Sequence, residues 1–220
     1  EGFNYDMWMG PTEEAPYAEG RVHPQNGFSR PGWLQIERYC KGMITGWGSH
    51  MNDIAQWGNG TGDTGLIEIE AQGEFPKRGL FDVHTNYKAE GKWANGVKLY
   101  QETGDPGVRF EGDEGWIFVS RNKLEASDPN ILKQKIGPDG IKLYESNSHM
   151  RNFLECMRSR KDPVAPVEVG HRSNTICLIT HIAMKRGVRL EWDPKAERFK
   201  NDDQANAMLD YKHREPWSLA

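Results

Sequence analysis

Four polar side chains in a stretch of apolar sequence have the types and spacing that hydroxyl chemistry requires. They are His50, Asn52, Asp53 and Gln56. On a helix, His50 and Asp53 are one turn apart, so an imidazole and a carboxylate can face the same cleft. Histidine changes charge closest to neutral pH, which suits a general acid or base. The spacing predicts an acid–base pair, and the open alternative is a structural histidine bonded to a loop carbonyl.

The element expected to carry this pair is a short helix over residues 49–58. Ser49 is the candidate N-cap, and Gly58 is the expected stop. The intervening apolar residues have helical spacing. His50 would then lie in the first turn, where the helix dipole disfavours a protonated imidazole and a nearby carboxylate favours it.

Further candidate ligand contacts lie in a lead-in segment over residues 1–32. This segment is rich in Gly and Pro but also carries aromatic residues, so we expect it to be ordered along a protein surface. Arg21, His23 and Arg30 are candidate donors to a sugar or carboxylate. Solvated loop charges are the alternative for these three residues.

The middle of the chain has the pattern of an antiparallel sheet. Residues 67–71 alternate apolar and acidic side chains, as in a half-buried strand. We expect a hairpin between strands at 80–87 and 97–101, turning at Asn95-Gly96, and a second between strands at 108–112 and 116–120. A short edge strand is expected at 124–126. One mostly antiparallel sheet over residues 65–127 follows from these spacings.

The last third of the chain is predicted to be mainly helical. Met150, Phe153, Leu154 and Met157 are spaced as one helical face. A second helix begins near Pro166 and stops at Gly187, and it carries Glu168 and His171. Sheet and helices follow one another without βαβ alternation, so the predicted fold class is α+β, with a large sheet and helices packed on one face.

Composition excludes several other classes. Of the 220 residues, 28 are Lys or Arg and 32 are Asp or Glu, a net charge of -4 that argues against nucleic acid as the main partner. No apolar run is long enough for a membrane span. Three Cys residues make no disulfide framework or zinc site. His171 and His181 lie about 15 Å apart along one helix and cannot share a metal. The glycine clusters lack the context of a dinucleotide fingerprint.

Four segments in order carry a family resemblance. They are Trp-Met-Gly-Pro at 8–11, Gly-Trp-Gly-Ser-His at 46–50 continued by Asp-Ile-Ala-Gln-Trp-Gly at 53–58, Val-Arg-Phe-Glu-Gly at 108–112 with Gly-Trp-Ile at 115–117, and Pro-Val-Ala-Pro-Val-Glu at 163–168 with Gly-His-Arg at 170–172. Together they resemble the C-terminal domain of the Gfo/Idh/MocA oxidoreductases, in particular a bacterial subgroup.

The resemblance implies a function and an assignment of roles. His50 resembles the catalytic histidine that handles the proton of a substrate hydroxyl, and Asp53 resembles the acidic residue that supports it. Asn52, Gln56, Arg21, His23, Arg30, Glu168 and His171 are the expected substrate contacts. Many members carry Asp four positions before the histidine, where this chain has Gly46. A substrate-orienting carboxylate is therefore absent at that position.

The resemblance also implies a cofactor and partners outside these residues. NAD or NADP would be bound mainly by an N-terminal Rossmann domain that the 220 residues do not contain. We expect a lead-in at 1–32 and one substrate-binding and oligomerisation domain at 33–220, acting on a carbohydrate-like molecule. Homo-oligomers through the sheet face are expected, with no nucleic-acid or membrane partner. We expect a cytoplasmic location, or export directed by a leader upstream.

Two other interpretations stay open at this point. A non-catalytic binding or scaffold module would use the sheet for self-association without chemistry. A sugar-binding module would use some of the eight Trp residues, although most of them occupy positions where packing accounts for them.

Overall fold

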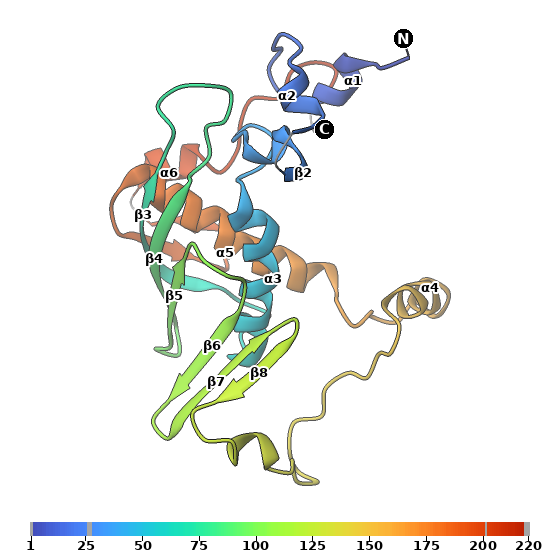
Figure 1. Ribbon diagram of the computed structural model, residues 1–220, viewed down its shortest axis with the longest axis vertical. Helices are drawn as coiled ribbons and strands as arrows, with labels where there is room; N and C mark the ends of the chain where they lie inside the picture. The colour runs from blue at the N-terminus through green and yellow to red at the C-terminus, as the bar shows by residue number, and fades with distance from the viewer. Residues whose placement is uncertain (1, 26–27, 201, 218–220) are drawn as a thin grey trace. The chain divides into compact units, whose positions relative to one another are not determined.

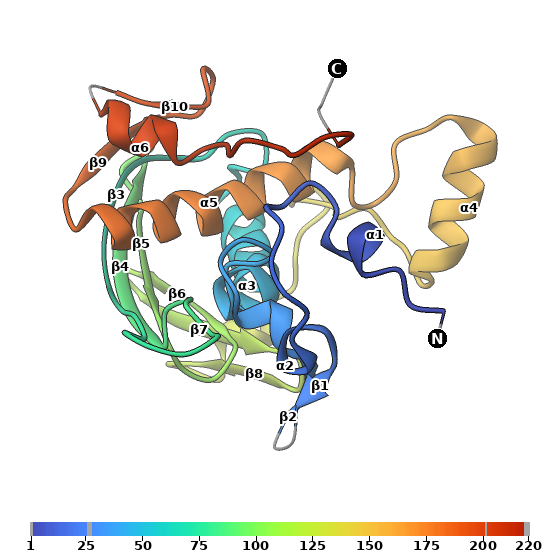
Figure 2. The ribbon, with the colours of Figure 1, turned by 90° about the horizontal axis from the view of Figure 1, so that it is seen from above.

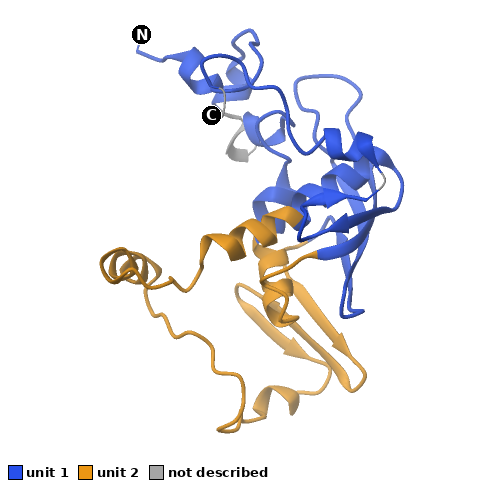
Figure 3. Ribbon diagram, turned by 180° about the vertical axis from the view of Figure 1, so that it is seen from behind, with its two compact units in different colours: residues 1–49, 66–104, 176–220 blue, residues 50–65, 105–175 orange. Residues whose placement is uncertain are grey.

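The computed structural model describes residues 2–25, 28–200 and 202–217, which divide into two compact units (Figure 3). Unit 1 comprises residues 1–49, 66–104 and 176–220, and unit 2 comprises residues 50–65 and 105–175. The fold is α+β, as predicted, and no described helix has the length and apolar character to cross a membrane.

Figure 1 labels the elements in chain order. They are α1 (Tyr5–Met9), α2 (Glu19–Val22), β1 (Pro24–Gln25), β2 (Phe28–Pro31), η1 (Gly32–Gln35), α3 (Met43–Gly58), β3 (Leu66–Glu74), β4 (Asn86–Trp93), β5 (Lys98–Glu102), β6 (Val108–Gly112), β7 (Gly115–Ser120), β8 (Lys123–Ala126), η2 (Ile131–Lys133), α4 (His149–Ser159), α5 (Val167–Arg186), β9 (Leu190–Asp193), β10 (Arg198–Phe199) and α6 (Asp203–Ala207).

Unit 1 contains a five-stranded antiparallel sheet in the order β10-β9-β3-β4-β5. The predicted alternation in β3 holds, because Ile69 and Ala71 are buried while Glu70 is exposed. Ile69 pairs with Gly91 on β4, where a Cβ atom would lie only 2.6 Å from Leu66 Cδ1. This strand pair therefore needs a residue without a side chain at position 91.

The second half of α5 packs against one face of this sheet (Figure 2). Gln101 on β5 donates from Nε2 to Thr180 Oγ1 at 3.1 Å, and Met184 lies against Gly73 on β3. Buried apolar side chains in α5 and in the strands of this sheet include Leu66, Ile69, Trp93, Ile176, Ile179 and Trp192. The expectation of helical packing on a sheet face agrees with these contacts.

The strand predicted at 80–87 is wrong in position, because β4 begins at Asn86 and residues 80–85 form no strand. The backbone amides of Asp82 and Val83 instead donate to the carbonyl of Gln35, at 3.1 and 3.4 Å. Those amides are then unavailable for a sheet ladder. The predicted turn is correct, since Trp93 donates to the carbonyl of Val97 around Gly96, whose φ is +89°.

Unit 2 contains a separate three-stranded antiparallel sheet in the order β6-β7-β8. The second predicted hairpin is correct, and it closes with Gly115 at φ +154°. The single sheet expected over 65–127 is wrong in extent, because it divides between β5 and β6. Residues 104–107 read Gly-Asp-Pro-Gly, a sequence that interrupts strand pairing.

Candidate active site

Helix α3 carries the predicted acid–base pair but begins six residues earlier than expected. It starts at Met43, directly after Gly42, whose φ of +75° turns the chain into the helix. Ser49 is therefore not an N-cap, and its Oγ donates to the Gly46 carbonyl at 2.9 Å. His50 lies in the middle of the helix, so the predicted influence of the helix dipole on its imidazole is wrong. Its side chain is exposed.

Asp53, one turn after His50, is held by a residue outside the predicted site. Ser173 on α5 donates from Oγ to Asp53 Oδ1 at 2.8 Å. Ser173 is only 3% exposed, whereas Asp53 is half-buried. Asp53 Oδ2 accepts no hydrogen bond from the residues that the structure describes. One oxygen of this carboxylate is therefore fixed by a donor on α5.

The buried side chains of unit 2 are mostly polar. Buried polar residues of unit 2 are Asn52, Gln56, Thr61, Asn152 and Ser173, whereas Ala55 is its one buried apolar side chain among the described residues. Burying polar groups requires hydrogen-bond partners and adds less stability than burying apolar groups. Of these residues, Ser173 donates a hydrogen bond to Asp53.

Gln56 serves the loop that follows α3. Its Nε2 donates to the Thr64 carbonyl at 3.2 Å, and its Oε1 accepts from Thr61 Oγ1 at 3.2 Å. Its side chain has no exposed surface, and Asn52 is also buried. Substrate contact by Gln56 remains a prediction that would require this loop to open.

The first part of α5 presents two further predicted residues to solvent. His171 is exposed, and Glu168 Oε1 accepts from Arg172 Nε and Nη2, both at 2.8 Å. This ion pair spans one helical turn and fixes the guanidinium group. His171, Glu168, His50 and Asp53 all belong to unit 2.

The three lead-in candidates belong to unit 1. Arg21 Nη1 donates to Tyr5 Oη and to the Pro16 carbonyl, so its guanidinium braces the N-terminal segment. His23 Nε2 lies 3.1 Å from Tyr17 Oη. The Arg30 side chain lies outside the described residues, although its backbone is part of β2. Substrate contact by these three residues remains a prediction.

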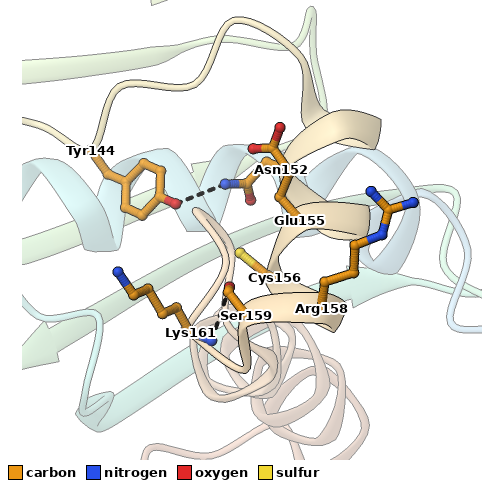
Figure 4. Close-up of a pocket in the computed structure, with 7 residues that line it drawn as sticks. All are labelled: Tyr144, Asn152, Glu155, Cys156, Arg158, Ser159 and Lys161. Carbon is orange, nitrogen blue, oxygen red and sulfur yellow. Dashed lines mark hydrogen bonds between the residues drawn. The ribbon is translucent and has the colours of Figure 1, made fainter.

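A pocket of about 500 Å³ in unit 2 does not include the predicted site residues (Figure 4). Its lining residues are Tyr144, Asn152, Glu155, Cys156, Arg158, Ser159 and Lys161. Asn152 donates from Nδ2 to Tyr144 Oη at 2.8 Å and accepts from the Val164 amide at 2.9 Å. Asn152 thereby connects α4 to the segments before and after it.

The arrangement around Asp53 is suited to proton transfer with a hydroxyl compound. An exposed imidazole can exchange a proton with a ligand, and a carboxylate one turn away can accept a hydrogen bond from it. The sequence signal for Ser173 is its position directly after the Gly-His-Arg motif at 170–172. That signal does not reveal that its hydroxyl reaches a residue 120 positions away.

Comparison with protein families gives one match across the chain. The family model described as "Oxidoreductase family, C-terminal alpha/beta domain" (GFO_IDH_MocA_C2) matches residues 1–219. No curated protein matches the chain in sequence.

Several solved structures share the fold. An NAD-binding protein from Listeria innocua is 17% identical with a TM-score of 0.53, over 78% of this chain and 57% of its own. The WlbA dehydrogenase from Bordetella pertussis, in complex with NADH and UDP-GlcNAcA, is 16% identical with a TM-score of 0.54, over 78% and 51%. An aldose–aldose oxidoreductase from Caulobacter crescentus, complexed with glycerol, is 13% identical with a TM-score of 0.54, over 72% and 50%. The chain thus spans about half the length of these proteins.

Proposed function

Because the chain belongs to the Gfo/Idh/MocA oxidoreductase family as its C-terminal alpha/beta domain, we propose that it is the substrate-binding part of an NAD(P)-dependent oxidoreductase. Its substrate is a sugar, cyclitol or glycoside, of which one hydroxyl or keto group is oxidised or reduced. The observation that carries this proposal is the exposed His50 one helical turn before Asp53, whose Oδ1 is fixed by Ser173.

His50 is the proposed general acid–base group. Oxidation of a hydroxyl to a carbonyl releases a proton, which an exposed imidazole accepts; in the reverse direction the imidazole returns it. Asp53 offers Oδ2 to the imidazole or to a substrate hydroxyl. Glu168, Arg172 and His171 are placed on α5 as polar groups that can contact other hydroxyl groups of the substrate.

The glycines that the structure describes at 46–62 do not have the setting of a dinucleotide site. Gly46 and Gly48 lie inside α3, Gly58 is its last residue, and Gly60 and Gly62 follow its end. A dinucleotide fingerprint instead joins a strand to the start of a helix. We therefore place NAD or NADP mainly on another domain of the full-length protein. The role proposed for the present chain is proton transfer to and from the substrate.

Self-association through the five-stranded sheet is a second part of the proposal. The face opposite α5 carries charged side chains from several strands, with Arg189 Nε 3.1 Å from Glu70 Oε2 and Lys98 Nζ 2.8 Å from Glu90 Oε1. Acids and bases alternate on this face, so a second copy would meet groups of both signs. Sedimentation of the chain over a range of concentrations tests this, and a monomer at all of them would contradict it.

A dehydrogenase screen of the full-length protein over polyols and glycosides, with NAD and with NADP, tests the proposed chemistry. Replacing His50 with Ala is expected to lower kcat by about 10²–10⁴-fold, the usual contribution of acid–base catalysis. His149→Ala, at the exposed start of α4, is the matched control and should leave turnover unchanged. Undiminished turnover in His50→Ala would remove His50 from the mechanism.

Calorimetric titration of NADH into the isolated chain tests the proposed location of the cofactor. We expect no saturable heat, because the described residues offer no phosphate-binding turn at a strand end. Tight binding would show that these residues hold the dinucleotide. The proposal that NAD or NADP is bound mainly by another domain would then be wrong. A full-length protein without activity and without self-association would instead favour a sugar-binding module.

A further inference from the structure

The hydroxyl group of Ser173 connects its own helix, α5, to a residue on α3. Serine and threonine in a helix commonly satisfy the hydroxyl on a carbonyl of the preceding turn. Thr175 does this, donating from Oγ1 to the His171 carbonyl at 2.8 Å. The hydroxyl of Ser173, two positions earlier, reaches a carboxylate on another helix, at 2.8 Å.

We propose that Ser173 is a positioning residue for the proposed proton transfer, because it fixes Asp53 so that Oδ2 faces the imidazole of His50 or the substrate. This inference rests on the proposed function. Ser173 is 3% exposed and cannot itself reach a ligand in this structure, so its influence must pass through Asp53.

The hydrogen bond restricts Asp53 in two ways. It selects one side-chain rotamer, because Oδ1 must stay within reach of a buried hydroxyl that α5 holds in place. It also distinguishes the two carboxylate oxygens, since Oδ1 has a donor and Oδ2 has none among the described residues. Hydrogen bonds from hydroxyl groups to ionised carboxylates are among the stronger ones in proteins. A half-buried carboxylate without such a donor would rotate between several orientations.

Packing alone does not require this contact. A side chain as small as that of Ser could be replaced by Ala with the loss of one oxygen atom, and helix propensity would favour the Ala. A polar connection between two buried helix faces is costly unless both groups are satisfied. The hydrogen bond belongs to the proposed site and not to the general packing of unit 2, because its acceptor, Asp53, lies one helical turn from His50.

The test uses the full-length protein with Ser173→Ala, Ser173→Thr and Asp53→Asn, alone and combined. We expect Ser173→Ala to lower kcat/KM by about tenfold or more, the value of a hydrogen bond to a charged group. Most of the loss should appear in kcat, with a changed pH profile, and Ser173→Thr should recover much of it. In the Asp53→Asn background, Ser173→Ala should have little further effect.

A control variant and a spectroscopic measurement accompany the kinetic test. Thr175→Val, which removes a hydroxyl from the same helix, is the matched control and should leave kcat/KM unchanged. In the isolated chain, Ser173→Ala should shift the carboxyl carbon resonance of Asp53, which is a readout independent of turnover.

The outcomes distinguish this inference from the function on which it rests. An active wild type whose Ser173→Ala variant loses stability but keeps kcat/KM and its pH profile would overturn the inference alone. Equal losses from Ser173→Ala in the wild-type and Asp53→Asn backgrounds would do the same. A wild type that oxidises and reduces no hydroxyl compound would overturn the proposed function, and the positioning role with it.

Discussion

Glu37 and His181, 144 positions apart in the sequence, meet through a 3.0 Å hydrogen bond between Oε1 and Nε2. The other oxygen of Glu37 accepts from Lys185 Nζ at 2.9 Å. Because His181 is 1% exposed, the bond connects the segment after η1 to the buried side of α5. These two hydrogen bonds hold the pKa of Glu37 at about 2, against the opposing effect of its burial. The ring of His84 lies beside that of His181, with 6.2 Å between their centroids.

The first prediction concerns the stability of the chain in acid. Burial, and to a lesser degree His181, lowers the pKa of His84 to about 4, so the unfolded chain takes up this proton at a higher pH than the folded chain. The free energy of unfolding should fall as the pH drops from about 6.5 to about 4, by on the order of 3 kcal/mol. Below about pH 4.5, protonation of Glu37 in the unfolded state should lower it further, toward pH 2.

Urea unfolding at a series of pH values measures this dependence. His84→Gln should flatten the upper part of the curve, between about pH 6.5 and 4. His149→Gln serves as a control, because His149 is exposed on α4. A curve for His84→Gln that follows the wild type would contradict the assignment.

Two carboxylates should differ in their effect on stability. Glu37→Gln weakens two charge-assisted hydrogen bonds and leaves Lys185 without its anion, so we expect a loss of about 2 kcal/mol in the free energy of unfolding. Glu13 forms an exposed ion pair with Arg38 at 3.5 Å, with the Glu13 side chain 82% exposed. Glu13→Gln should change stability by less than about 0.5 kcal/mol. Equal effects in urea unfolding would show that the hydrogen bonds of Glu37 to His181 and Lys185 add no more stability than an exposed ion pair does.

Two glycine-to-alanine changes should have opposite effects on the free energy of unfolding. At Gly91 the new methyl group would collide with the buried Leu66, so we expect a loss of about 1–3 kcal/mol. At Gly170, inside α5, no atom beyond the local helix backbone lies within 4 Å of the position that an alanine methyl group would take. Ala should therefore add up to about 1 kcal/mol through helix propensity. Thermal unfolding of the two variants checks both, and a stabilised Gly91→Ala variant would contradict the register of β3 and β4.

The apolar face of α4 should tolerate polar substitution in the isolated chain. Phe153 and Leu154 are 52% and 46% exposed, although their spacing is that of a buried helix face. Phe153→Gln is expected to change the free energy of unfolding by less than about 1 kcal/mol. Ile176→Ala, at a fully buried position of α5, should lose about 2–5 kcal/mol in the same measurement. If Phe153→Gln lowered the free energy of unfolding as much as Ile176→Ala does, the apolar face of α4 would be packed against other residues and not exposed.

Local features of the fold could be predicted because neighbouring residues determine them. The alternation at 67–71 identifies a strand with one buried face, and Gly96 and Gly115 occupy positive φ angles at the hairpin turns. Gly187 ends α5 at φ +66° for the same reason. The order of motifs around His50 is sufficient for the family, which the match over residues 1–219 confirms.

The wrong predictions lie where local propensity does not decide the structure. Residues 80–85 are apolar enough for a strand, but their amides are used by Gln35. The start of α3 is predicted too late, because Gly46 and Gly48 resemble a loop and yet lie within the helix. Neither error is visible from local propensity, since tertiary contacts override it.

The sequence by itself determined the α+β class, the turns, the family and the placement of His50 and Asp53 one turn apart on one helix. These depend on backbone angles and on the 3.6-residue period, which act over a few residues. Only the tertiary structure decided that Ser173 donates to Asp53, that Glu37 meets His181, and that the apolar face of α4 is exposed. Such contacts depend on how separate elements pack against one another. The spacing of residues within one element does not determine that packing.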